Sequence, residues 1–128
     1  MRTSLNPQSV PRSPFYAQGV EVSPGGRTVY VSGQVGVGPD GAPEEGIGAQ
    51  TTRAVANVHA VLAEAGLGPE SVVSQRVYLT SAEAMPGFIE AAAAFLGADP
   101  PATTLLVVAG LADPALLVEI EAVAVGPA

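Results

Sequence analysis

The chain has 128 residues, of which 48% are hydrophobic and 13% charged, and its formal net charge is −7. This length suits one domain, and no apolar run reaches the roughly 18 to 20 residues that span a bilayer. The only cations are five scattered arginines, so the charge argues against nucleic-acid binding. With no cysteine, no lysine and one histidine, the chain has no thiolate nucleophile, no Schiff-base lysine and no multi-histidine zinc site.

The N-terminal residues 1–8 are polar and lack the apolar stretch of a secretion signal. Together with the absence of cysteine, this favours a cytoplasmic protein that has no membrane partner. The apolar content exceeds what one small core needs, because a domain of this size leaves about a third of its surface wet. We therefore expect part of the surface to be buried against other subunits.

The first third of the chain predicts an irregular arm, two strands and a loop. Residues 1–14 are rich in proline and are expected to be irregular. Residues 15–22 and 28–35 predict strands, and the Ser-Pro-Gly-Gly turn at 23–26 predicts that they pair as a hairpin. Residues 36–48 are rich in glycine, proline and acidic residues and predict a loop.

The middle of the chain predicts two helices separated by a strand. Residues 49–65 predict the first helix, because one stripe of apolar residues recurs at helical spacing: Val55, Val58, Leu62 and Ala65. Residues 72–80 predict a strand. The second helix is expected at about 84–96, with Pro86 in its first turn and an alanine run in its middle.

Two apolar strands, 103–109 and 116–125, complete the order ββαβαββ, an α+β fold with a mixed sheet. Because these strands are apolar on both faces, both faces need cover. Two helices cover one face, and nothing in the chain remains for the other. Another copy of the sheet is the simplest cover, which predicts a homo-oligomer.

Glu119 and Glu121 are the most informative polar pair. In a strand, residues i and i+2 point to the same face, roughly 6.5 to 7 Å apart, so both carboxylates are expected on the face assigned to the subunit contact. Partial burial and a neighbouring like charge favour protonation, which makes them candidates for a general acid or base. The alternative is a pair that reaches solvent or meets an arginine across the interface.

Two other polar features lie within predicted strands. Glycine in Ser32-Gly33-Gln34 indicates either the close approach of a ligand or backbone, or a bulge. Arg76 lies in mid-strand, and we expect it to pair with Glu119 or Glu121 or to bind an anion.

Three further side chains have simpler structural explanations. Tyr16 offers a phenol to a cleft edge, although a packing tyrosine is commoner. Thr103, with Thr104, opens an apolar strand, where β-propensity explains it as well as a hydroxyl in the same cleft. His59 lies off the apolar stripe of its helix and is expected at the surface.

Short segments along the chain, none distinctive alone, occur in a specific order. They are Tyr16-Ala17-Gln18-Gly19-Val20, Ser32-Gly33-Gln34, Gln50, Asn57-Val58-His59-Ala60-Val61-Leu62, Ala65-Gly66, Val77-Tyr78-Leu79-Thr80, Pro101-Ala102 and Val118-Glu119-Ile120-Glu121-Ala122-Val123-Ala124. In this order they resemble the RidA/YjgF family over nearly the whole chain from about Pro14 onward.

The resemblance implies a chorismate-mutase-like fold in a homotrimer with a barrel-like centre and three clefts between subunits. It also implies hydrolysis of reactive enamines and imines, as small-molecule substrates, to carbonyl compounds and ammonia without a metal or organic cofactor. Tyr16, Ser32, Gly33 and Glu121 match positions that line the family's cleft. Glu121 would orient or activate the attacking water, and the Gly33 backbone would help to hold the substrate.

The chain departs from the family at its key arginine. Active deaminases carry Pro-Ala-Arg-Ser where this chain has Pro101-Ala102-Thr103-Thr104, and a threonine cannot replace a bidentate guanidinium contact to a substrate carboxylate. The family's asparagine in the second helix is also absent, with Ile89 near its place. These departures predict an apolar cleft and a ligand less anionic than a 2-imino acid. The alternatives are a catalytically inactive binding or regulatory trimer, or an Arg76 that replaces the missing arginine.

Overall fold

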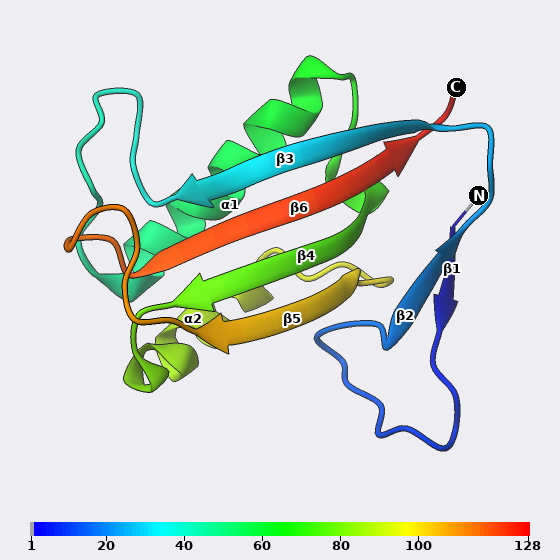
Figure 1. The fold of residues 1–128 in the computed structure, drawn as a ribbon, viewed down its shortest axis with the longest axis horizontal. Helices are drawn as coiled ribbons and strands as arrows, with labels where there is room; N and C mark the ends of the chain where they lie inside the picture. The colour runs from blue at the N-terminus through cyan, green and yellow to red at the C-terminus, as the bar shows by residue number, and fades with distance from the viewer. Residues whose placement is uncertain (1) are drawn as a thin grey trace.

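The computed structural model describes residues 2–128, which form a four-stranded sheet with two helices on one face. Figure 1 shows this sheet from the side opposite the helices. The strand order is β3 (Arg27–Val35), β6 (Val118–Gly126), β4 (Val72–Leu79) and β5 (Ala102–Val107). β4 and β5 are parallel and the other pairs are antiparallel. The predicted α+β architecture with a mixed sheet is confirmed.

The helices are α1 (Gly46–Glu64) and α2 (Met85–Ala93), which pack against each other. Short 3₁₀ turns, η1 (Pro69–Ser71) and η2 (Ala82–Ala84), precede β4 and α2. α2 ends earlier than predicted, because the amides of residues 94–96 bond to carbonyls three residues back, the tighter pattern that ends many helices. No helix within residues 2–128 is long and apolar enough to cross a membrane.

The N-terminal arm differs from the prediction, since its first residues form strand β1 (Arg2–Leu5). β1 pairs antiparallel with β2 (Gly19–Val22), and β3 pairs with β6, so the predicted hairpin between 15–22 and 28–35 is wrong. The Arg2 guanidinium holds the arm in place by donating hydrogen bonds of 3.0 to 3.4 Å to the carbonyls of Glu70, Asp99 and Pro100. These contacts join residues that are far apart in the sequence, so the local pattern from which the hairpin was predicted does not contain them.

The core lies between the helices and one face of the sheet. Val118, Ile120, Ala122 and Ala124 of β6 are at most 3% exposed and pack in one cluster with apolar residues of α1. The intervening residues of β6 lie on the other face, which no element of the described range covers (Figure 1). Tyr30 of β3 is 78% exposed and lies on this open face, because its neighbour Val31 is buried in the core.

A buried glutamine, Gln50, ties α1 to the loop that leads into β6. Its amide nitrogen donates to the carbonyls of Glu44 (3.1 Å) and Ala115 (2.9 Å), and its amide oxygen accepts from the Leu117 N–H (2.8 Å). The side chain is 2% exposed, so these backbone groups have little access to water. Gln50 therefore helps to fix where β6 begins.

Replacing Gln50 with leucine should destabilise the protein by roughly 2 to 4 kcal/mol, because buried backbone groups lose their partners. Urea unfolding followed by circular dichroism measures this change, and Thr52→Ala, at an exposed site on the same helix, is the control. A loss equal to that of the control would show that the Gln50 hydrogen bonds do not stabilise this junction.

Candidate functional site

A polar cluster lies at the middle of the open face. Arg76 of β4 is the register partner of Glu121 of β6, and its Nη1 lies 3.9 Å from Glu121 Oε1. The Tyr78 hydroxyl donates a hydrogen bond to the same carboxylate oxygen. The predicted pairing of Arg76 with a strand carboxylate is confirmed, and so is the common face of Glu119 and Glu121. This cluster holds one carboxylate between a cation and a hydroxyl donor, with about a third of it exposed (37%).

Tyr78 belongs to this cluster although it was not selected as a site residue. Its hydrogen bond to Glu121 is the main cause that raises the pKa of Tyr78 above its ordinary value, and partial burial adds to the effect. The signal in the sequence was its spacing, because Tyr78 lies two residues after Arg76 and so shares its face of the strand. No three His, Asp or Glu side chains gather as a metal site within residues 2–128.

The glycine within β3 marks a bulge and a close approach. The register between β3 and β6 shifts between Val31 and Gln34, so Ser32 and Gly33 lie where the ladder is irregular. A Cβ at Gly33 would overlap the Glu119 carboxylate, which lies against this backbone. The register shift confirms the bulge, and the group that approaches the Gly33 backbone is a side chain of the same chain, Glu119. Both Ser32 and Gly33 are exposed.

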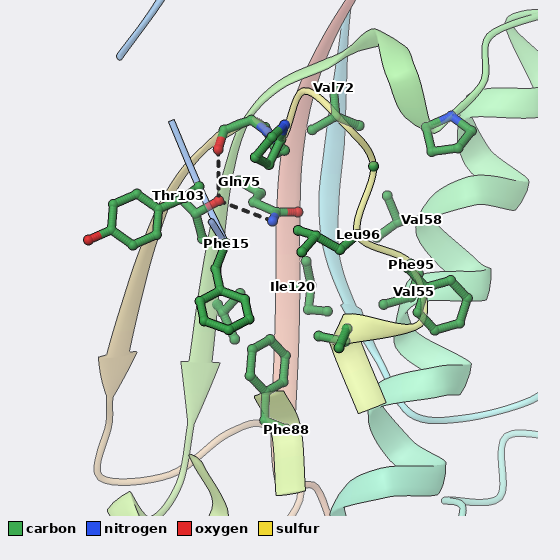
Figure 2. A pocket seen from close by; sticks show the side chains of 18 of the residues that line it. Phe15, Val55, Val58, Val72, Gln75, Phe88, Phe95, Leu96, Thr103 and Ile120 are labelled. Atoms are coloured by element: carbon green, nitrogen blue, oxygen red, sulfur yellow. Dashed lines mark hydrogen bonds between the residues drawn. The ribbon is translucent and has the colours of Figure 1, made fainter. Parts of the chain in front are cut away.

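A pocket of about 280 Å³ lies on the other side of the sheet, between the two helices and strands β4 and β5 (Figure 2). Its lining is mostly aliphatic and aromatic, and includes Phe15, Val55, Val58, Phe88, Phe95, Leu96 and Ile120. Polar groups come from Tyr16, His59, Gln75 and Thr103. Thr103 Oγ1 accepts a hydrogen bond from Gln75 Nε2 (3.1 Å) and donates one to the Pro101 carbonyl (3.2 Å).

The structure does not bring Thr103 and Glu121 into one cleft within a single chain. Thr103 is the β4 partner of Gln75 and faces the helices, whereas Thr104 is the partner of Arg76 and lies on the open face. Strand alternation places the two residues on opposite faces of one sheet, so the expected cleft between subunits can hold both only if they come from two copies of the chain.

Tyr16 lies at the pocket because the next residue, Ala17, is bonded to the start of β5. Ala17 forms a parallel bridge to Ala102, and its N–H donates to the Pro101 carbonyl (3.0 Å). This bridge places Tyr16 at the N-terminal end of β5, next to Thr103, and both Tyr16 and Thr103 line the pocket. Ile89, the residue near the family's asparagine, lines it too.

His59 also lines this pocket, so its predicted place at the surface is wrong. Its ring is half-buried and meets Phe95 edge to face, with the ring centres 6.0 Å apart. Burial lowers the pKa of His59 below its ordinary value, and the negative charge of Glu70 opposes this effect in part. The residues after α2 that cover His59 lie far away in the sequence, which is why the α1 pattern did not reveal this burial.

The lowered pKa of His59 predicts a loss of stability on mild acidification. In the unfolded chain, His59 binds a proton near its ordinary pKa of 6.5, whereas in the folded protein it binds one only at lower pH. The free energy of unfolding should therefore fall as pH decreases from about 7.5 to about 5.5. In His59→Gln, which has no such proton to bind, the fall should be smaller. Urea titrations at several pH values measure both slopes, and equal slopes would contradict the burial of the imidazole.

Comparison with known proteins places the chain among its relatives. It is 36% identical over 111 residues to a RutC family protein of Saccharolobus solfataricus, a match that covers 85% of each protein. A match to a RutC family protein of Aquifex aeolicus is 39% identical but spans 82 residues, 62% of that protein.

Solved structures show the same fold. A Rid family protein from Yersinia pestis is 38% identical, with a TM-score of 0.86 over 96% of this chain and 97% of that one. RidA from an Antarctic Psychrobacter is 34% identical, with a TM-score of 0.73 over 85% and 86% of the two chains. The family profile described as Endoribonuclease L-PSP matches residues 8–126. The chain therefore belongs to the RidA/YjgF family, as the order of its sequence motifs predicted.

Proposed function

We propose that this protein hydrolyses neutral enamines or imines, with the Glu121 carboxylate as the general acid and base. The observation that supports this most is the cluster in which Arg76 and Tyr78 both contact Glu121 on an uncovered sheet face. Family membership supports the reaction class, and the fixed carboxylate supplies the group that moves the proton.

The reaction needs one proton carrier and one water. Glu121 takes a proton from water as the water oxygen bonds to the imine carbon, and it returns a proton to the nitrogen. This gives a carbinolamine, and Glu121 then carries its hydroxyl proton to the amino nitrogen as the carbon–nitrogen bond breaks, which releases ammonia and leaves the carbonyl compound. An enamine first takes a proton on carbon to become the imine. Arg76 and Tyr78 position the carboxylate, and the Arg76 side chain, 58% exposed, remains accessible to a substrate.

A homotrimer with the cleft between subunits fits the separation of Thr103 from Glu121. A substrate can contact both residues only if they come from two copies of the chain, because they lie on opposite faces of one sheet. β5 forms an edge of that sheet, where Ala17 pairs with its first residue, Ala102, and the rest of the edge strand is open to a neighbour. Ser32, Gly33 and Tyr16 then complete the proposed substrate contacts.

The substrate is proposed to be neutral because Thr103 stands in place of the family's arginine. A substrate carboxylate there would be desolvated without a guanidinium partner, which is costly. The same threonine favours a second candidate function, a trimer of this family that binds a ligand without turning it over. Ribonuclease activity is not proposed, because the chain has a net charge of −7 and its single histidine faces the apolar pocket.

Glu121→Gln should lower kcat/KM for ammonia release from neutral imines by about 100-fold or more, since the amide cannot move the proton. Tyr78→Phe should have a smaller effect, because the carboxylate remains. Coupled ammonia detection measures the rates on a panel of neutral imines and enamines generated in situ, with 2-iminopropanoate as the anionic comparison.

Glu64→Gln, at an exposed position of α1, is the control and should retain full activity. If the wild-type protein releases ammonia from none of these compounds faster than buffer does, the proposed hydrolysis is contradicted and the second candidate, ligand binding without turnover, replaces it. A preference for 2-iminopropanoate would contradict the neutral substrate class.

Tyr30→Asp should break the proposed trimer of 12.8 kDa chains, because it places a charge in the apolar contact on the open face. Light scattering coupled to size exclusion measures the mass, which should fall toward that of one chain. Ala56→Asp adds the same charge on the exposed face of α1 and should leave the mass unchanged. A folded wild-type monomer at micromolar concentration would contradict the assembly.

A further inference from the structure

We infer that a second pocket, between the N-terminal arm and residues 98–100, binds a small phosphate monoester that also carries hydroxyl groups. This pocket has a volume of about 310 Å³. Besides Tyr16, its polar lining consists of Ser4, Asn6, Arg12, Ser13 and Asp99. None of these is a proposed substrate contact, and among the described residues neither Thr103 nor any member of the Glu121 cluster lines this pocket. The inference concerns binding alone and does not rest on the proposed hydrolysis.

Arg12 supplies the positive charge that this pocket can offer to a ligand. Each of the other arginines bonds to backbone carbonyls or pairs with a carboxylate. The Arg12 side chain is exposed and has no such partner within residues 2–128. A guanidinium presents a planar fork of N–H donors that matches two oxygens of a phosphate or a carboxylate. Arg12 is therefore free to bind an anionic ligand.

Asn6 and Ser13 add donors that the fold leaves unused. Asn6 Oδ1 accepts a hydrogen bond from the Gln18 N–H (3.1 Å), and Ser13 Oγ accepts one from the Phe15 N–H (3.0 Å). These contacts use the oxygens, so the Asn6 amide nitrogen and the Ser13 hydroxyl proton remain for a ligand. Together with Arg12 they suit an anion with at least three acceptor oxygens, which favours a phosphate over a carboxylate.

The chain on both sides of this pocket is anchored by hydrogen bonds. Gln18 Nε2 donates to the carbonyl of Pro11, the residue directly before Arg12 (2.7 Å). The Arg2 guanidinium donates to the Asp99 carbonyl (3.0 Å), which ties the start of the arm to the opposite wall. Because these contacts order the walls without a ligand, less conformational freedom is lost on binding, and this favours affinity.

Asp99 and the size of the pocket favour hydroxyl groups on the ligand. The Asp99 carboxylate accepts a hydrogen bond from the Ser4 hydroxyl and lies 3.8 Å from Arg2 Nη1, so its charge is partly balanced. The Asp99 side chain is 60% exposed, and a carboxylate can accept further hydrogen bonds. An apolar cavity of about 150 Å³ accepts benzene. The volume of about 310 Å³ therefore leaves room for a short hydroxylated chain beside the phosphate.

Glycerol 3-phosphate is the probe for this site, with glycerol as the neutral comparison and L-lactate as the carboxylate comparison. Isothermal titration of the full chain should give a Kd for glycerol 3-phosphate in about the millimolar range or tighter. Glycerol should not bind, and lactate should bind at least about tenfold more weakly, because it has fewer anionic oxygens. The net charge of −7 repels anions from most of the surface, so saturable binding indicates a specific site.

Arg12→Gln should weaken the binding of glycerol 3-phosphate at least about tenfold. Arg53→Gln removes the same charge from the ion pair with Glu44, away from this pocket, and should leave the Kd nearly unchanged. Arg12→Lys keeps the charge but loses the fork, so its affinity should lie between those of the wild type and Arg12→Gln. Asn6→Asp keeps an acceptor for the Gln18 N–H and replaces the donor by a negative charge, so it should also weaken binding at least about tenfold.

Thr103→Val alters the pocket between the helices and the sheet and should leave the Kd for glycerol 3-phosphate unchanged. Circular dichroism establishes that each variant is folded, and the Arg12 variants decide the question if Asn6→Asp does not fold. The inference is overturned if the wild-type protein does not bind glycerol 3-phosphate, or binds glycerol or lactate equally well. It is also overturned if folded Arg12→Gln binds like the wild type, or if Arg53→Gln or Thr103→Val weakens binding as much as Arg12→Gln does.

Discussion

The alternation of side chains along β6 is the constraint on which the rest of the molecule depends. β6 lies between β3 and β4 and contributes Val118, Ile120, Ala122 and Ala124 to the core. The same geometry directs the intervening residues, including Glu121, to the face without helices. A shift of one residue would bury carboxylates under α1 and expose the core, so the register is strongly specified. The core and the polar cluster are thus two results of one pattern.

The pocket between the helices and the sheet depends on a second constraint, the short length of α2. This helix ends at Ala93, and the chain continues through a tighter turn that carries Phe95 and Leu96. The amides of residues 94–96 bond to carbonyls three residues back, so this turn stands in place of a further turn of α-helix. The turn instead brings Phe95 against His59 and leaves a cavity over β4 and β5. The burial of His59 and the space beside it therefore have the same cause.

These two constraints explain how much of the protein the sequence predicted. The faces of β6 and the pairing of Arg76 with Glu121 follow from the period of a strand, which local spacing records. The partner of β2 and the burial of His59 depend on segments far away in the chain, which local spacing does not record. The family motifs grouped Thr103 with Glu121, but a motif read along a chain does not show on which face of a sheet each residue lies. The separation of these two residues became visible only in the structure.

Thr103 is the position at which the pocket between the helices and the sheet either carries or lacks a positive charge, and its side chain does not contact the open face of the same sheet. Its neighbour Thr104 lies on the open face with Arg76, so within one chain a change at Thr103 acts on the helical side. An arginine there would bring a cation among Phe88 and the other apolar walls, and that cation would require an anionic ligand in order to be buried. A threonine requires no counterion and instead bonds to Gln75 and the chain itself. The loss of the family's arginine is therefore compatible with a stable pocket, and it is the physical reason for proposing a ligand without a negative charge there.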